Sequence, residues 1–128
     1  KLFDYFDIKT PGKVHIIPAG AAVMDLIHRY YNNELTDLNC LDEKSSGKNK
    51  GIYRDGFHLS RESAVEWVVG YLYFGILYGV SPEKIVDFHP EEVPENLDRI
   101  LRHIAWKAII ESPFTGITDI DQDGYSDN

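Results

Sequence analysis

The sequence has a single cysteine, Cys40, so no disulfide bond can form within the chain. It also has no extended basic run. Only 13 Lys and Arg stand against 21 Asp and Glu, giving a net charge of -8 and a pI of about 5.0. Nucleic-acid binding is therefore poorly supported, because it depends on basic side chains that neutralise phosphates. Cys40 has no matching His and Asn pattern, so it is a poor candidate for a thiol nucleophile.

Long apolar runs are also absent. The most apolar segment, residues 64–80, contains Glu66 together with several Tyr and Gly residues, so we expect no transmembrane segment. The first residue is Lys1 rather than Met, and residues 1–7 lack the apolar core of a signal peptide. We expect the chain to be a processed, trimmed or partial product.

The composition is that of a folded protein. The 128 residues are 43% hydrophobic and 12% aromatic, which suffices for one domain and argues against general disorder. Apolar spacing predicts helices over residues 21–32, 60–78 and 95–111, with a short helix near residues 82–86. We expect Ser60 to cap the start of the second helix and Gly79 to cap its end, while Pro113 stops the third. The polar residues 33–50 are predicted to form a loop.

Residues 13–17 form the only convincing strand, because a β-branched run lies there between Gly12 and Pro18. A buried strand needs neighbours along both edges to pair its backbone groups. A strand joined to a helix by a short link is typical of an α/β unit with a parallel sheet. We therefore predict the C-terminal portion of a larger α/β domain, mostly helical within this chain and with one core strand. The other strands would lie on a missing segment or on another chain.

Asp55 and His58 are the leading candidates for catalysis. They lie three residues apart on a turn that contains Gly56, just before the second predicted helix. A carboxylate that accepts a hydrogen bond from one ring nitrogen of a His fixes the tautomer and leaves the other nitrogen available as a base. The turn would thus supply two of the three parts of a Ser-His-Asp hydrolase. The alternative is an ordinary polar turn with a His packed at a helix start.

Residues 2–115 resemble the C-terminal part of the SGNH/GDSL hydrolase superfamily. The resemblance is carried by the strand and turn of residues 14–20, by the aromatic-rich helix end at residues 71–79, and by the block Asp55-Gly56-Phe57-His58-Leu59-Ser60. It implies a three-layer αβα, flavodoxin-like fold and the hydrolysis of esters, often acyl esters of carbohydrates or lipids. It also implies that His58 is the general base, that Asp55 orients it, and that catalysis needs no cofactor.

The sequence departs from that family in one large respect. The Gly-Asp-Ser-like nucleophile block and the oxyanion-hole Gly and Asn blocks are absent, and no serine of the chain lies at a strand-to-helix elbow beside a glycine. The hypothesis is therefore that the serine nucleophile lies on the remainder of the hydrolase domain, in a missing segment or a separate chain. The alternative is a non-catalytic structural or assembly subunit derived from a hydrolase domain.

The acidic tail, residues 116–128, is predicted to be separate from the hydrolase-like region, residues 1–115. Its alternating acids resemble the start of the Ca²⁺ loops of EF-hand, dockerin and thrombospondin type-three repeats. The resemblance implies that Asp119, Asp121 and Asp123 supply side-chain oxygens. It also implies that Tyr125 supplies a backbone carbonyl and that Asp127 makes a direct or water-bridged contact. It also implies an extracellular, periplasmic or cell-envelope protein. The alternative is a solvated acidic linker.

The remaining histidines are predicted to have packing or surface roles. His28 lies one helical turn after Asp25 and would make a surface contact with it, and His15 is expected to pack on the strand. His89 and His103 have no partner at metal-ligand spacing.

Overall fold

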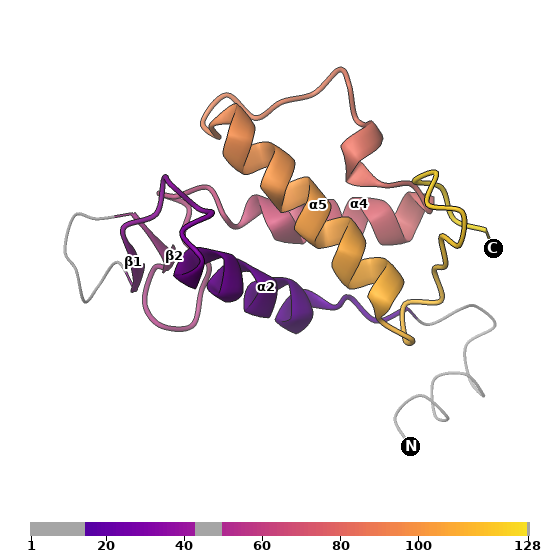
Figure 1. Cartoon of the computed structure of the whole chain (residues 1–128), viewed down its shortest axis with the longest axis horizontal. Coiled ribbons are helices and arrows are strands. Elements are labelled where there is room, and N and C mark those ends of the chain that lie inside the picture. Colours follow the sequence, from indigo (N-terminus) through magenta and orange to yellow (C-terminus); the bar gives the residue numbers. More distant parts are fainter. Residues whose placement is uncertain (1–14, 43–49, 128) are drawn as a thin grey trace.

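The computed structural model describes residues 15–42 and 50–127. In chain order these residues form α2 (Ala19–Tyr31), β1 (Cys40–Asp42), β2 (Gly51–Tyr53), α4 (Trp67–Tyr78), the 3₁₀ helix η1 (Pro82–Lys84) and α5 (Glu95–Glu111) (Figure 1). The described part of the chain is therefore a mixed α/β arrangement of three α-helices and a small two-stranded parallel sheet. None of its helices is both long and apolar enough to cross a membrane.

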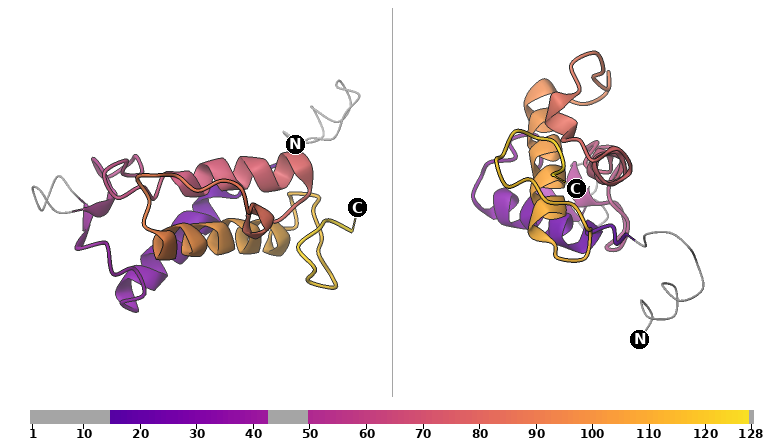
Figure 2. Two further views of the ribbon diagram at one scale, coloured as in Figure 1. Left: turned by 90° about the horizontal axis from the view of Figure 1, so that it is seen from above. Right: turned by 90° about the vertical axis from the view of Figure 1, so that its right-hand side faces the viewer.

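Helix α5 packs against both other helices: α4 runs alongside it, and α2 crosses behind the pair in the left view of Figure 2. It is amphipathic, and its apolar side chains recur at the spacing that places them on one side of a helix. Leu26 of α2, Leu72 of α4, and Leu101 and Ile104 of α5 are completely buried. The core is thus formed chiefly among the three helices, and the small sheet lies at one end of the molecule (Figure 1).

Two of the three predicted helices agree closely with the structure. Helix α5 has the predicted bounds, and α2 begins and ends within two residues of the prediction. The second predicted helix ends as expected, at Gly79 in the left-handed conformation (φ +63°), but it begins at Trp67 rather than after Ser60. Residues 61–66 form turns instead, and Ala64 at φ +62° is incompatible with a continuous right-handed helix.

Ser60 is not the helix cap that the sequence suggested. Its buried hydroxyl oxygen accepts a hydrogen bond from the backbone N–H of Ser63 at 3.3 Å. The Ser63 hydroxyl in turn donates to the carbonyl of Gly51 at the start of β2. Both serines therefore fasten the turns before α4 to the sheet.

The predicted core strand is wrong over the residues that the structure describes. Residues 13 and 14 lie outside the described residues, and residues 15–17 have no strand pairing. The N–H of Ile16 donates to the carbonyl of Phe114 at 3.3 Å, which ties this segment to the chain after α5. The strands lie instead in and after the predicted loop, where Cys40 pairs with Gly51 and Asp42 with Tyr53.

The C-terminal tail packs against the ends of α4 and α5. Thr115 is completely buried and Ile117 nearly so. The N–H of Ser81 donates to the carbonyl of Gly124 at 2.7 Å, and the N–H of Ser126 donates to the carbonyl of Gly79 at 2.7 Å. The backbone therefore fixes the acidic segment against the end of α4.

Two glycines of α4 differ in what surrounds them. A Cβ on Gly75 would overlap Cδ1 of the buried Ile109, whereas a Cβ on Gly70 would meet only the ring of Trp67, at 3.9 Å. Gly75→Ala is therefore expected to destabilise the protein by about 1–3 kcal/mol through overpacking, partly offset by helix propensity. Gly70→Ala is the control and is expected to stabilise it by up to about 1 kcal/mol. Urea denaturation of the two variants would measure both changes, and equal midpoints would contradict the packing argument.

Candidate active site

The turn that follows β2 holds Asp55 in a fixed position. The N–H of Arg54 donates to the carbonyl of His58 at 2.8 Å and closes the turn. Oδ1 of Asp55 accepts the backbone N–H of Phe57 at 3.2 Å and that of His58 at 3.0 Å. Gly56 has a φ of +84°, a conformation that suits glycine and allows the chain to reverse within so few residues. Hydrogen bonds between near neighbours in the sequence therefore define this turn.

The imidazole of His58 lies against the Asp55 carboxylate, as the sequence predicted. Nδ1 is 2.9 Å from Oδ2 and 3.0 Å from Oδ1. Nδ1–H donating to this carboxylate leaves the lone pair of Nε2 available to accept a proton. The His58 side chain is 67% exposed, against 34% for Asp55, so the carboxylate is the more sheltered member of the pair.

The turn also keeps Asp55 ionised. The backbone N–H of His58 holds the pKa of the Asp55 carboxyl far below its usual range, and the imidazole of His58 and the N–H of Phe57 act in the same direction. A carboxylate that accepts several hydrogen bonds is stabilised in its charged form. Asp55 therefore carries its negative charge at neutral pH, where it can orient the imidazole and stabilise its protonated form.

A groove of about 710 Å³ lies beside the pair. His58 and Phe57 come from the turn, Arg54 and Arg61 flank them, and Trp67, Gly70 and Tyr73 line it from α4. One wall is thus apolar and aromatic, while charged groups lie around the imidazole. Such a mixture suits a ligand with one polar and one apolar part.

No serine, threonine or cysteine is among the described residues that line this groove. Ser60 and Ser63 are close in sequence, but both are buried and their oxygens hold the turns before α4. Ser81 is buried at η1, where its oxygen accepts the N–H of Glu83 at 3.2 Å. Ser45 and Ser46 lie outside the described residues. Among the residues that the structure describes, the base and its orienting carboxylate therefore lie together without a serine, threonine or cysteine lining the groove.

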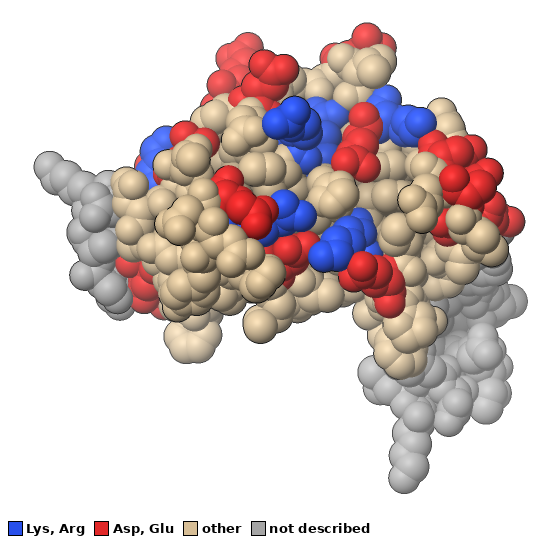
Figure 3. All heavy atoms as spheres, viewed as in Figure 1, with Lys and Arg blue, Asp and Glu red and all other residues tan. Residues whose placement is uncertain are grey.

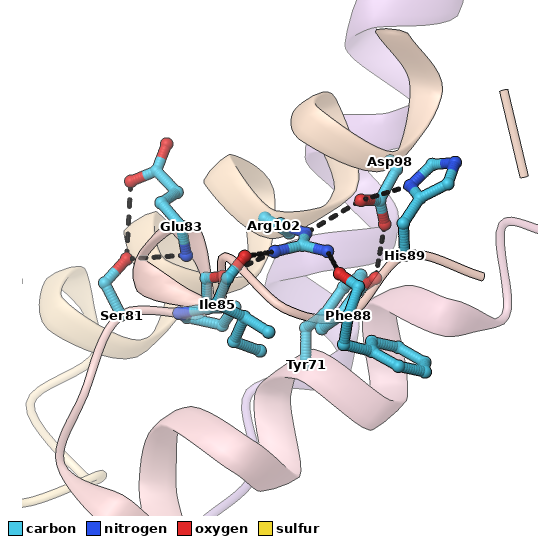
Figure 4. Close-up of polar contacts among 9 residues, drawn as sticks. Tyr71, Ser81, Glu83, Ile85, Phe88, His89, Asp98 and Arg102 are labelled. Atoms are coloured by element: carbon cyan, nitrogen blue, oxygen red, sulfur yellow. Dashed lines mark hydrogen bonds and ion pairs between the residues drawn. The ribbon is translucent and has the colours of Figure 1, made fainter. Parts of the chain in front are cut away.

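A second polar cluster, which the sequence analysis missed, lies between α4 and α5 (Figure 4). Its centre is Asp98, which is 4% exposed. The carboxylate of Asp98 accepts Nε–H of Arg102 at 2.8 Å and the hydroxyl of Tyr71, and it lies 3.2 Å from Nδ1 of His89. Burial, together with the hydrogen bond to Asp98, raises the pKa of Tyr71 well above its usual range. His89, for which the sequence showed no partner at metal-ligand spacing, thus contacts Asp98 as a packing residue.

Arg102 uses its remaining donors on the loop between α4 and α5. Nη1 donates to the carbonyls of Pro82 at 3.2 Å and Ile85 at 2.6 Å, and Nη2 donates to the carbonyl of Phe88 at 2.7 Å (Figure 4). Its guanidinium also lies over the Tyr71 ring, 5.2 Å from the centroid. A cavity of about 790 Å³ opens beside this cluster. Because the donors of Arg102 are occupied by the protein itself, the cluster holds the 82–94 loop onto α5.

The other histidines also differ in part from the predictions. Asp25, the expected partner of His28, accepts hydrogen bonds from Arg29 at 3.2 Å and Lys107 at 3.3 Å. His103 is 3.1 Å from a carboxylate oxygen of Glu83 and remains exposed.

Three of the predicted metal ligands lie together in the tail. Asp119, Asp121 and Asp123 each offer a carboxylate oxygen, and these oxygens lie within 4.8 Å of one another. Figure 3 shows acidic side chains gathered at the edge of the molecule where the tail lies in Figure 1, whereas basic and acidic side chains are mixed over the middle of that face. The predicted ligand Asp127 accepts the N–H of Ile120 at 2.6 Å, and Tyr125 packs under Lys84, with 5.3 Å between Nζ and the ring centroid.

Asp119 is the most constrained of these acids. Its Oδ2 accepts the indole N–H of Trp106 at 2.8 Å and the backbone N–H of Gly124 at 3.2 Å. Its Oδ1 is buried without a hydrogen-bond partner in the described structure. A buried carboxylate oxygen without a partner is costly, and a hard cation such as Ca²⁺ would satisfy it. The donor set, all carboxylate oxygen, also fits Ca²⁺.

No protein-family model, curated protein or solved structure was found to match the chain.

Proposed function

We propose that this chain supplies the His and Asp of a Ser-His-Asp ester hydrolase of the SGNH type. The observation that carries the proposal is the hydrogen-bonded pair of Asp55 and His58, held by a tight turn at the edge of a groove. The serine and the oxyanion donors would come from a further segment or a second polypeptide. Together with this chain they would form a three-layer αβα domain.

The proposed mechanism is acyl transfer. Nε2 of His58 takes the proton of the serine hydroxyl as the serine oxygen attacks the ester carbonyl. The alcohol then leaves with a proton returned by His58, and a water activated by the same imidazole hydrolyses the acyl-enzyme. Asp55 keeps the tautomer correct and stabilises the imidazolium at 2.9 Å. The apolar wall at Trp67 and Tyr73 would receive the apolar part of a carbohydrate or lipid ester.

A fluorophosphonate probe tests this function, because it forms a covalent bond only with an activated serine. The protein purified from its source would be sized under native conditions, treated with the probe and separated under denaturing conditions. We expect a particle larger than 14.7 kDa and a label on a serine outside this 128-residue segment. A folded particle of this segment alone without a label would overturn the proposal.

A second candidate function is structural, with the tail binding Ca²⁺ in a non-catalytic module. The observation that favours it is the buried Oδ1 of Asp119 beside the carboxylates of Asp121 and Asp123. A bound ion would link Asp119, whose carboxylate accepts the indole N–H of Trp106 on α5, to the segment around Tyr125, which pairs with Val80 after α4. Such loops are suited to the Ca²⁺ levels outside cells, and the proposal includes an extracellular or cell-envelope location.

Adding Ca²⁺ is expected to raise the Tm of the protein, because the ion would bind the tail in the folded state. At a Ca²⁺ concentration about 100 times the Kd, binding to the folded state alone would contribute about 2.7 kcal/mol. Asp121→Asn removes one exposed ligand and should abolish most of the rise in Tm. Asp87→Asn, an exposed acid outside the cluster, makes the same charge change and should leave the rise intact. A wild-type Tm that does not respond to Ca²⁺ would contradict the metal site.

A further inference from the structure

The groove of the candidate active site carries an excess of positive charge within a strongly acidic chain. Its described lining includes Arg54 and Arg61 against a single carboxylate, that of Glu66, whereas the whole chain has a net charge of -8. With histidine counted as neutral, the cavities beside Asp98 and beside Asp119 are each lined by one more acid than base. A groove whose charge is opposite to that of the molecule favours a negatively charged ligand.

Arg54 lies opposite the proposed base. Its backbone N–H donates to the carbonyl of His58 at 2.8 Å, and both residues line the groove. Nη2 of Arg54 is 3.5 Å from Oδ2 of Asp55, which is longer than the hydrogen bonds of a bidentate arginine–carboxylate pair. Asp55 is already engaged by the imidazole at 2.9 Å and by two backbone N–H groups. The Arg54 guanidinium, which is 50% exposed, therefore keeps donors available for a second anion.

Arg61 supplies a second guanidinium to the lining of the groove. Among the described residues it is paired through Nε alone, to Oε2 of Glu66 at 3.2 Å. Its side chain is 77% exposed, so the two Nη groups remain for a ligand. A guanidinium binds a carboxylate, phosphate or sulfate group through two parallel N–H bonds, and the single contact at Nε leaves that mode of binding open.

The indole of Trp67 gives the same groove an apolar surface of fixed orientation. Its N–H donates to Glu92 at 3.1 Å, and its ring packs on Phe88 with 5.7 Å between the centroids. The indole therefore offers the groove its ring rather than its polar N–H. Phe57, which is 89% exposed on the turn, and Tyr73, which is 51% exposed on α4, add two further rings to the lining. Such rings suit the apolar or aromatic part of a ligand.

We propose that the substrate of this groove is an anionic ester, in which an aromatic or alkyl group carries a carboxylate, phosphate or sulfate. The inference rests on the proposed function, which places the ester carbonyl beside His58. Arg54 and Arg61 bind the negatively charged group, and Trp67 packs against the apolar group. Because Arg54 lies opposite His58, the charged group lies close to the bond that is cleaved. The groove volume of about 710 Å³ is sufficient for a small molecule of this kind.

The binding of two probes that differ in charge tests the inference. Phenylbutyrate carries a carboxylate, and phenylbutanamide is its neutral counterpart of nearly the same shape. Each would be titrated into the purified protein at constant ionic strength while the indole N–H signal of Trp67, assigned by its loss in Trp67→Phe, is followed by NMR. We expect the carboxylate to bind about fivefold more tightly than the amide. Equal affinities, or no shift of the Trp67 signal with either probe, would overturn the inference.

The double variant Arg54→Gln/Arg61→Gln locates the preference in the groove. Both side chains are exposed, so the fold should persist, and thermal denaturation would confirm it. The variant should bind the two probes equally. Arg99→Gln removes an exposed arginine on α5 that does not line the groove, and it should retain the preference for the carboxylate. A preference that survives in the double variant would overturn the inference.

Equilibrium binding requires no nucleophile, so its outcome is separate from that of the proposed function. A protein that prefers the carboxylate but is not labelled by the fluorophosphonate retains the anion site and loses the hydrolase function. A labelled protein that binds both probes equally retains the hydrolase function and loses the anionic substrate. In a labelled protein, the double variant should raise the KM for the nitrophenyl monoester of glutaric acid about fivefold and leave that for nitrophenyl valerate unchanged. An equal rise for both esters would overturn the inference.

Discussion

His58→Ala in the assembled protein is expected to lower ester hydrolysis by about 10²–10⁴-fold, because the serine loses its general base. The fold should be unaffected, since the His58 side chain is 67% exposed and its hydrogen bond joins it only to the neighbouring Asp55. The rate of hydrolysis of an activated ester and the rate of serine labelling by a fluorophosphonate should fall together. Thermal denaturation would confirm that the variant remains folded.

His103→Ala is the matched control for this experiment. His103 is 52% exposed and also lies beside a carboxylate, that of Glu83 at 3.1 Å, but it belongs to a different face and does not line the groove. Its loss should leave the hydrolysis rate unchanged. A rate that survives His58→Ala, or that falls equally in both variants, would remove the catalytic role of His58.

Asp55→Asn tests the pair in a second way. The amide oxygen can still accept the N–H groups of Phe57 and His58, so the turn should persist. The amide nitrogen, however, takes the position of Oδ2 and cannot accept the Nδ1–H of His58, so the imidazole keeps at most the contact with Oδ1 and loses the negative charge that stabilises its protonated form. We expect a large fall in the maximal rate with little change in the Tm.

The predictions from the sequence were best for features that depend on residues close together along the chain. Helix α5 was correct because its apolar residues recur over 17 positions and Pro113 follows it. The contact between Asp55 and His58 was predicted because the two residues lie three positions apart on one turn, so that the local backbone brings their side chains together. The strands were missed because each has only three residues, too few for alternation to be visible. The β-branched run at residues 13–17 was misleading, because in its described part the N–H of Ile16 donates to the chain after α5 and no neighbouring strand is present.

The cluster around Asp98 depended on contacts between distant parts of the sequence. Tyr71 and Asp98 are 27 residues apart, and nothing local brings them together. One signal was nevertheless present. Asp98 and Arg102 stand four residues apart and continue at helical spacing to the buried Ala105 and Ile109. Two opposite charges on the apolar side of an amphipathic helix indicate a buried ion pair.

Arg102→Met is expected to destabilise the protein by about 3–5 kcal/mol, because it leaves Asp98 buried with its ion-pair partner removed. It also removes the donors to the carbonyls of Pro82, Ile85 and Phe88. Arg99→Met is the control on the same helix. Arg99 is exposed and donates to Asn96 at 3.0 Å, so its loss should cost no more than about 1 kcal/mol. Urea denaturation would measure both, and similar midpoints would contradict the role assigned to Arg102.

The double variant Asp98→Leu/Arg102→Met separates the buried charge from the loop contacts. Removing both ions relieves the uncompensated charge, so part of the lost stability should return. The three loop carbonyls would still lack their donor, so the 82–94 loop should remain loosened. Phe88 of that loop packs on Trp67 at 5.7 Å between ring centroids, and the Trp67 indole N–H donates to Glu92 at 3.1 Å. Because Trp67 lines the groove at His58, the double variant should raise the KM for an ester more than it lowers kcat.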